Sequence, residues 1–164
     1  MRRIIGKLLI YKAIAVAGAV LLTGLPAHAA DQKPVAIVVH PETNVNELSM
    51  AELRRVLFAE QQFWSDKSRI TLMVSAPATY ARRVVLKRIY EMNEAQFRTY
   101  WIAKMFRAEV PSGPKIVLSS NMALELITAV PGSITFMLAS EVNDTVKVVR
   151  IDGKLPGEEG YPLN

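Results

Sequence analysis

The chain has 164 residues, no cysteine, and 20 basic against 15 acidic side chains, which gives a formal net charge of +5. The lack of cysteine excludes thiol catalysis, cysteine-ligated zinc and a lipid anchor on an N-terminal cysteine. Four basic residues and no acidic residue lie in the first 30 positions, so residues 31–164 carry only +1 and their charge gives no argument for a nucleic-acid partner.

The first 30 residues have the three parts of a secretory signal peptide. A basic start precedes an apolar stretch of 13 residues, and the small residues AHAA follow. A membrane anchor is the alternative, but a helix that spans a bilayer needs about 20 apolar residues. We therefore expect export, cleavage after Ala29 or Ala30, and a periplasmic mature chain of a size that suits a single domain.

The mature chain begins with a strand, a helix and a second strand. The β-branched run 34–41, PVAIVVHP, predicts a buried strand. Ser49 and Glu52 have the spacing of a capping box, and they begin a helix that is expected to end near Glu60. The run 69–77, RITLMVSAP, predicts the second strand, which a proline closes.

Two helices are predicted next. The first covers residues 78–92, and the second covers 93–110 with Asn93 and Gln96 as its capping box. Large apolar side chains recur every three or four residues in the second helix, which favours its core side over an exposed aromatic binding face. These residues are Phe97, Tyr100, Trp101, Met105 and Phe106.

The last third of the chain also alternates between strand and helix. A third strand is predicted over 115–120 and a helix over 121–130, with Ser120 or Asn121 as its cap. The Pro-Gly pair at 131–132 ends this helix, because proline cannot continue it and glycine supplies the positive φ that often follows a helix end.

Two further strands are expected over 133–140 and 146–153, and residues 154–164 are expected to form an exposed tail. Alternating strands and helices predict one α/β domain over residues 31–153, with a mixed, mostly parallel sheet flanked by helices. In such sheets, ligands tend to bind at the carboxyl ends of strands, against the N-terminal ends of helices.

The junction VSAPATYARR is the first candidate binding site. The start of a helix offers unpaired N–H groups and a partial positive charge to an anion. Ser75, Thr79 and Tyr80 would add hydroxyl groups, and Arg82 or Arg83 would clamp an oxyanion. The alternative is structural, with Thr79 or Ser75 as the helix cap and the two arginines on a solvated face.

The junction SSNMA is the second candidate, because Ser119 and Ser120 place two hydroxyl groups before a helix, although simple capping also explains them. His40 is the single histidine of the mature chain and has no second metal ligand at a suitable spacing, so we expect it to be structural or solvated. No phosphate loop, metal cluster or catalytic set is visible in the sequence. We therefore expect no cofactor, and the sequence argues against an enzyme.

The order of these segments resembles the periplasmic phosphate-binding proteins of phosphate ABC transporters, especially their short forms. The segment NELSMAELRRVLFAEQQFW resembles the family pattern Leu-Ser/Thr…Leu…Ile-Phe…Trp, and FRTYWIAKMF resembles its Tyr-Trp…Phe stretch. The run PGSITF resembles its Pro-Gly-Ala-Ile-Gly-Tyr signature, with Thr135 and Phe136 in place of the second Gly and the Tyr. The matching positions are Leu48, Ser49, Leu53, Leu57, Phe58, Trp64, Trp101, Phe106, Pro131, Gly132 and Ile134.

This resemblance, which runs from about Val35 to Val149, implies one lobe of a type II periplasmic binding protein. It implies that phosphate or a related oxyanion is bound for an inner-membrane ABC transporter or sensor. Full-length relatives have two lobes that close on the ligand, whereas this chain is about half their size and has Pro-Ala-Thr at 77–79 where they have Ser-Gly-Thr. Thr79 would keep one hydroxyl, and Arg82 or Arg83 one cation.

Two hypotheses follow from this resemblance. In the first, the oxyanion site is weak, or a partner completes it, and a homodimer could rebuild a two-sided cleft. In the second, the chain is a ligand-free periplasmic interaction module that docks on a membrane sensor, a transporter or a second copy of itself.

Overall fold

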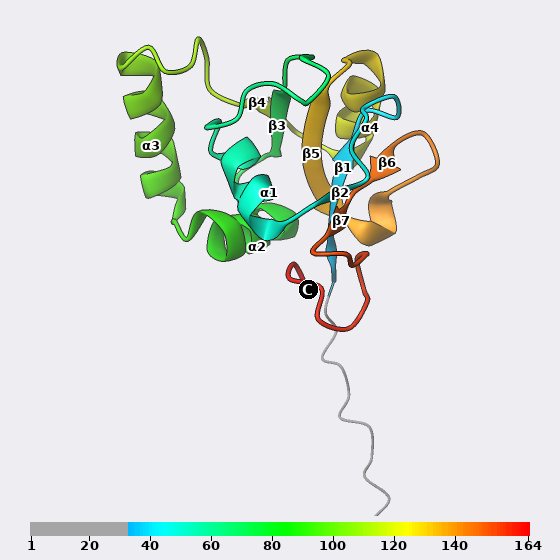
Figure 1. Ribbon diagram of the computed structural model, residues 1–164. Helices are drawn as coiled ribbons and strands as arrows, with labels where there is room; N and C mark the ends of the chain where they lie inside the picture. Colours follow the sequence, from blue (N-terminus) through cyan, green and yellow to red (C-terminus); the bar gives the residue numbers. More distant parts are fainter. Residues whose placement is uncertain (1–32) are drawn as a thin grey trace, which may run out of the picture. The chain divides into compact units, whose positions relative to one another are not determined.

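A five-stranded sheet with the strand order β4-β3-β5-β1-β6 organises the chain (Figure 1). The computed structural model describes residues 33–164, so the expected signal peptide and its cleavage site lie outside the described residues. None of the helices within 33–164 has both the length and the apolar character of a membrane span. The strands of the sheet are β1 (Val35–Val39), β3 (Thr71–Ser75), β4 (Lys115–Val117), β5 (Ser133–Leu138) and β6 (Lys147–Val148).

Four of these five strands share one direction. Strand β3 pairs in parallel with both β4 and β5. Strand β1 pairs antiparallel with β5 on one side and with β6 on the other. Since β1 alone runs against the rest, the predicted mixed, mostly parallel sheet is confirmed.

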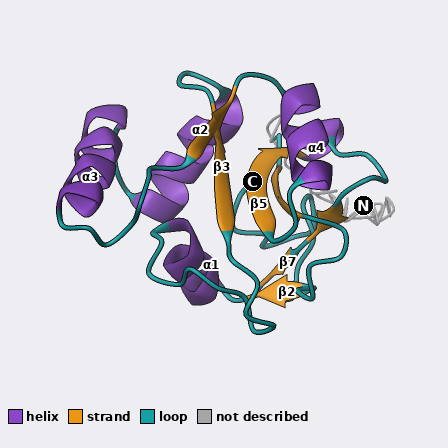
Figure 2. Cartoon of the chain, turned by 90° about the horizontal axis from the view of Figure 1, so that it is seen from above, coloured by secondary structure: helices purple, strands orange, loops and turns teal. Residues whose placement is uncertain are grey.

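Helices cover both faces of this sheet (Figure 2). Alternate residues of a strand point to opposite faces. Val35, Ile37 and Val39 of β1 lie in the larger core with α1, α2 and α3, whereas Ala36 and Val38 pack with α4 in a smaller core. The α-helices are α1 (Met50–Leu57), α2 (Tyr80–Val85), α3 (Glu94–Phe106) and α4 (Ser120–Ala129).

Both predicted capping boxes are present. The Ser49 hydroxyl accepts a hydrogen bond from the Glu52 N–H, and the Glu52 carboxylate accepts one from the Ser49 N–H at 2.8 Å. Asn93 and Gln96 make the same reciprocal pair at the start of α3. These local signals therefore fix where α1 and α3 begin.

The helix predicted over 78–92 changes its winding midway. After α2 it continues as a short π-helix, η1 (Leu86–Tyr90), and it ends at Glu91 in the left-handed conformation with φ 53°. In η1, Leu86, Ile89 and Tyr90 are all buried, and the Tyr90 hydroxyl donates to the Leu57 carbonyl of α1 at 2.6 Å. The apolar periodicity of the sequence does not predict this change from α-helix to π-helix, which is accompanied by contacts with α1.

The strand predicted over 146–153 is two short strands. Strand β6 pairs with β1, and the Val149 N–H donates to the Ile37 carbonyl at 2.9 Å. The chain then leaves the sheet, and β7 (Arg150–Ile151) pairs in parallel with β2 (Glu47–Leu48), which was not predicted. A strand of two residues is too short to show an alternation of apolar and polar side chains, so the sequence does not indicate that this segment is two strands.

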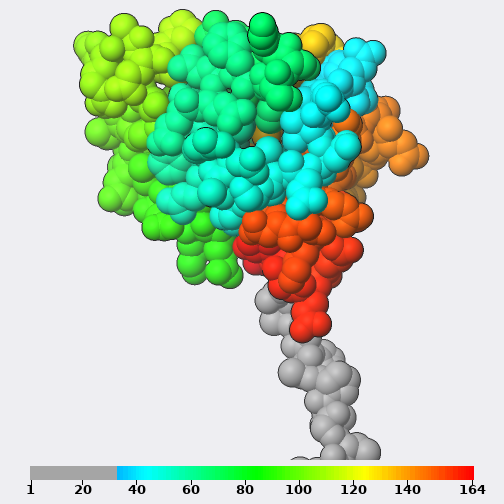
Figure 3. Space-filling model, viewed as in Figure 1, coloured from blue at the N-terminus to red at the C-terminus, as the bar shows by residue number. Residues whose placement is uncertain are grey.

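The prediction of an exposed tail over residues 154–164 is wrong in its last part. Tyr161 and Leu163 are buried. The Tyr161 hydroxyl donates to the Val35 carbonyl at 2.8 Å, and the Val35 N–H donates to the Leu163 carbonyl at 2.9 Å. Figure 3 shows this segment, in red, packed against the rest of the described chain. The tail was predicted to be exposed because most of its residues are polar or glycine. Its two buried apolar side chains cover the start of β1.

The core-side interpretation of the α3 side chains is confirmed for Phe97 and Trp101, which are buried. It is wrong for the end of the helix, where Met105 is partly exposed and Phe106 is 87% exposed. Since α3 lies at the edge of the helical layer (Figure 1), the described chain leaves Met105 and Phe106 of its last turn uncovered, although Lys104 in the same turn is buried.

Candidate functional site

A pocket of about 420 Å³ opens at the carboxyl ends of β3, β4 and β5, and we call it the strand-end pocket. Ser75, the last residue of β3, and Thr79, the cap of α2, line it, and so do Ser119, the cap of α4, and Ser120, its first residue. The structure therefore brings the two candidate junctions together in one place. This is the position in an α/β sheet where ligands commonly bind.

The start of α4 is built by Ser119. Its hydroxyl oxygen accepts a hydrogen bond from the Met122 N–H at 3.2 Å, so Ser119 is the cap, and not Ser120 or Asn121 as predicted. The cap comes one residue early because β4 ends at Val117 and only Leu118 separates the strand from the helix start. The first N–H groups of a helix have no partner within it, and here they lie beside the pocket.

The hydroxyl groups of the pocket differ in what they offer a ligand. Ser75 donates its hydrogen to the Phe136 carbonyl at 3.2 Å, and Thr79 donates its hydrogen to the Ala76 carbonyl at 3.1 Å. These two hydroxyls are therefore not free to donate to a ligand, and the Thr79 oxygen also accepts from the Arg82 N–H at 3.4 Å as the cap of α2, whereas Ser119 accepts a bond and keeps its hydrogen free. The hydrogen-bond donors that remain for a ligand therefore come from the start of α4.

Sequence reasoning missed the charged residue of this pocket, Glu141. It lies in the short 3-10 helix η2 (Ala139–Glu141) that follows β5, and its carboxylate accepts a hydrogen bond from the Leu138 N–H at 3.3 Å. Among the described residues, no Lys, Arg or His side chain lines the pocket. The signal that could have pointed to Glu141 was its place directly after a predicted strand, at the same edge of the sheet.

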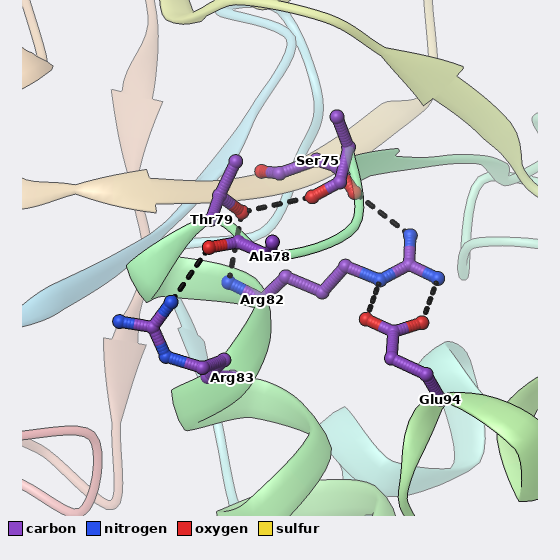
Figure 4. A network of polar contacts seen from close by, with 7 residues as sticks. Ser75, Ala78, Thr79, Arg82, Arg83 and Glu94 are labelled. Atoms are coloured by element: carbon purple, nitrogen blue, oxygen red, sulfur yellow. Dashed lines mark hydrogen bonds and ion pairs between the residues drawn. The ribbon is translucent and has the colours of Figure 1, made fainter.

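Arg82 has a role that neither sequence interpretation gave it. It is only 5% exposed, so it is not on a solvated face, and it does not line the strand-end pocket. Its guanidinium makes a bidentate ion pair with Glu94 of α3 at 2.7 and 2.8 Å, and it donates to the Ser75 carbonyl at 2.8 Å (Figure 4). The guanidinium also lies over the Phe97 ring, 4.8 Å from its centroid. Arg82 therefore joins β3, α2 and α3.

Arg83 and Tyr80 also lie outside the lining of the pocket. Arg83 is exposed and donates to the Ala78 carbonyl at 2.6 Å, which brings the guanidinium back over the first turn of its own helix (Figure 4). The same guanidinium lies 5.8 Å from the centroid of the Tyr80 ring. Of the seven residues predicted for the site, four therefore meet in the pocket and three are elsewhere.

The sequence matches no model of a known protein family and no curated protein. Solved structures of phosphate-binding proteins resemble it in fold. An ABC-type phosphate transport receptor from Vibrio cholerae superposes with a TM-score of 0.60 at 15% identity, over 75% of this chain and 48% of the receptor. PstS from Borrelia burgdorferi gives 0.63 at 14% identity, over 79% and 53%. A phosphate-binding protein from Stenotrophomonas maltophilia gives 0.56 at 11% identity, over 76% and 40%.

The chain spans about half the length of these solved structures. Identities of 11 to 15% establish the fold and not the ligand. The resemblance inferred from the order of sequence segments is thus confirmed at the level of architecture. The described chain has the fold of one lobe of a phosphate-binding protein, and its strand-end pocket lies at the carboxyl ends of the strands, where open α/β sheets commonly bind ligands.

Proposed function

We propose that the chain binds phosphate or a related oxyanion in the strand-end pocket, and that it does so as a periplasmic solute-binding protein that serves an ABC transporter or sensor. The observation that carries this proposal is that the Ser119 and Ser120 hydroxyls at the start of α4 share one pocket with Ser75 at the end of β3 and Thr79 at the cap of α2. The start of α4 adds N–H groups that favour an anion. The solute-binding fold of the chain is consistent with this use.

The arrangement of donors and acceptors favours an oxyanion that still carries a proton. Ser119 and the start of α4 would donate to the oxygen atoms of the ligand. Glu141 can only accept when it is ionised, so it repels a fully deprotonated anion but accepts from a P–OH group. Phosphate keeps a proton near neutral pH and sulfate does not. The pocket should therefore prefer phosphate to sulfate.

The expected affinity is low. An anion without a cation in its site, and with one side open to water, gains little from each hydrogen bond. We expect a dissociation constant in the range of about 1 mM, which corresponds to about −4 kcal/mol. A second surface, from a partner protein or a second copy, would tighten binding by covering the open side.

A charge reversal at the cap tests this proposal without removing the cap. Asp and Asn both cap helices as well as Ser does, so Ser119→Asp and Ser119→Asn should both keep the fold. In calorimetric titrations with phosphate, the Asp variant should lose binding because its carboxylate repels the ligand. The Asn variant should bind within a few-fold of the natural protein. Equal binding by the Asp variant and the natural protein would refute the strand-end pocket as the site.

A second candidate function is an interaction module, and exposed apolar side chains favour it. Phe106 at the end of α3 is 87% exposed and Leu118 after β4 is 74% exposed, with Ile102 and Ile116 also exposed nearby in sequence. A contiguous exposed apolar patch is typical of a protein contact, and Ile102 and Ile116 line one apolar pocket together. Light scattering is the test: a dimer that Phe106→Ser and Leu118→Ser convert to monomer would support it, and a monomeric natural protein would exclude self-association.

We also propose that residues 1–30 are removed on export and that the domain runs from residue 31 to residue 164, because Tyr161 and Leu163 belong to its core. The basic start, the apolar stretch and the AHAA site support this. Mass spectrometry of the protein from a periplasmic extract should give a chain that begins at Ala30 or Asp31. An intact N-terminus in that extract would contradict the proposal.

A further inference from the structure

We propose that a second pocket, at the other end of β3, binds a small organic anion through its carboxylate. This pocket has a volume of about 290 Å³ and lies where β3 and β4 begin, beside the loop 110–114. We call it the basic pocket, because Arg69 and Lys115 both line it. It shares no lining residue with the strand-end pocket.

The charge of the basic pocket is not neutralised by the residues around it. No Asp or Glu side chain lines it, and within residues 33–164 neither Arg69 nor Lys115 takes part in an ion pair. The carboxylate of Glu109, which directly precedes the loop, is already bound by Lys104 at 3.3 Å and by Arg107. Two free cations of different shape suit a carboxylate, which a guanidinium can bind with two parallel hydrogen bonds.

One wall of the basic pocket contains a buried donor that has no partner. Trp101 is 5% exposed, and its indole Nε1 makes no hydrogen bond within the described chain. The other tryptophan, Trp64, is also buried, but its Nε1 donates to the Gly132 carbonyl at 2.9 Å. A buried donor without an acceptor costs free energy, and because Trp101 is part of the pocket wall its indole N–H signal reports on occupancy of the pocket.

Proline rings and apolar side chains make up part of the remaining wall, beside the polar side chains of Gln62, Thr71 and Ser112. Pro111 and Pro114 line the pocket from the loop 110–114, and their rings restrict the backbone. Leu72 and Val110 complete an apolar surface beside the Trp101 ring. A ligand with a flat apolar body and one carboxylate therefore matches both halves of the pocket, whereas inorganic phosphate matches only the basic half.

The two pockets can be tested independently of each other. Thr71 lines the basic pocket and Ser75 lines the strand-end pocket, and these residues begin and end β3, which puts about 13 Å of strand between them. A variant in one pocket should therefore leave the other unchanged. Failure of phosphate binding and failure of this proposal are distinguishable results.

The probe is benzoate, and the readout is the indole N–H signals of the protein in ¹⁵N–¹H spectra of residues 31–164. The chain has two tryptophans, so two signals are expected, and Trp101→Phe assigns them. Benzoate should move the Trp101 signal in a saturable manner and leave the Trp64 signal in place. Acetate, which has no apolar body, should bind at least several-fold more weakly.

Variants then identify the pocket. The double variant Arg69→Gln, Lys115→Gln should weaken benzoate binding at least tenfold. Because both side chains are exposed, the variant should still fold. Arg83→Gln with Lys87→Gln removes two exposed cations elsewhere and should change nothing. Ser119→Asp should also leave benzoate binding intact.

Two results would overturn the proposal. One is the absence of any saturable shift of the Trp101 signal. The other is a shift that persists in the Arg69→Gln, Lys115→Gln protein. Trp101 also lines an apolar pocket with Ile102, Met105 and Ile116, and a persistent shift that Ile102→Glu removes would assign benzoate to that pocket instead.

Discussion

Arg82, at the start of a helix where an anion could bind, instead makes structural contacts within the protein. A guanidinium in the first turn of a helix opposes the helix dipole, which favours a nearby anion. Here the anion is supplied by the protein itself, because Glu94 begins the next helix and reaches back to Arg82. The guanidinium then cannot serve the strand-end pocket, and Ser119 with the start of α4 has to provide the donors.

Replacing Arg82 should therefore affect stability. Arg82→Gln leaves Glu94 without its partner, and because Glu94 is 37% exposed we expect a loss of about 2 kcal/mol, below the range for a fully buried pair. Arg83→Gln, at an exposed position, should change stability by less than about 0.5 kcal/mol. Urea unfolding of both variants measures this, and equal effects would contradict the structural role of Arg82.

Glu141 should set the selectivity of the strand-end pocket. Glu141→Gln removes the negative charge but keeps a side-chain oxygen that can accept from the Leu138 N–H. Sulfate binding should then tighten by about fivefold, the effect of about 1 kcal/mol of removed repulsion. Competition titrations with phosphate and sulfate measure the ratio. A preference for phosphate that does not change in the variant would mean that Glu141 does not face the ligand.

At the scale of single elements, the features that the sequence predicts are those decided within a few residues. The boxes at Ser49 and Asn93 place α1 and α3 correctly because each reciprocal bond spans only three positions. The π-helix η1 and the pairing of β2 with β7 depend on contacts with distant residues, as the hydrogen bond between Tyr90 and Leu57 illustrates. No local pattern contains that information.

The capping box of α1 should make stability depend on pH. Hydrogen bonds from the backbone N–H and the hydroxyl of Ser49 lower the pKa of Glu52 below its ordinary value of 4.5. A carboxylate with a lowered pKa stabilises the fold above its ordinary pKa, and this contribution disappears as pH falls through the folded pKa. The difference in unfolding free energy between the natural protein and Glu52→Gln should thus be larger at about pH 7 than at about pH 3. A difference that grows on acidification would contradict this.

At the scale of the whole described chain, the two ends of the domain meet on β1. Tyr161 bonds the carbonyl of Val35, and Leu163 is fully buried beside it. Burial also raises the pKa of Tyr161 above its ordinary value of 10.0, so its contribution is present below about pH 10 and declines as pH rises further. The last residues are therefore part of the fold.

Tyr161→Phe tests this role of the last residues. The variant keeps the ring and loses one buried hydrogen bond, so we expect a loss of about 1 kcal/mol at neutral pH. The difference from the natural protein should shrink above about pH 10, where the natural protein must hold the Tyr161 hydroxyl protonated. Denaturation of both proteins across this range measures it. No loss at neutral pH would show that the tail contributes little.

The candidate site was predictable in its parts and not in its assembly. The hydroxyls of Thr79 and Ser119 stand before helices, where capping chemistry makes them visible in the sequence. Their meeting in one pocket follows from β3 and β4 being parallel neighbours, which brings their carboxyl ends to one edge. Glu141, which follows β5, lines the same pocket, and Glu94 binds Arg82 outside it. Glu141 has only its place directly after a predicted strand as a signal, and the pairing of Glu94 with Arg82 is a tertiary contact without a local signal.

The central claim is that phosphate binds at the strand-end pocket, and a phosphate titration followed by the backbone amide signals of residues 31–164 tests it most directly. We predict saturable shifts at Ser119, Ser120 and Asn121 and in the loop 75–79, with half-saturation at roughly 1 mM phosphate. The amides of Arg69 and Lys115, at the other end of β3, should stay in place. An unchanged spectrum at roughly 20 mM phosphate, or shifts confined to other residues, would contradict the account.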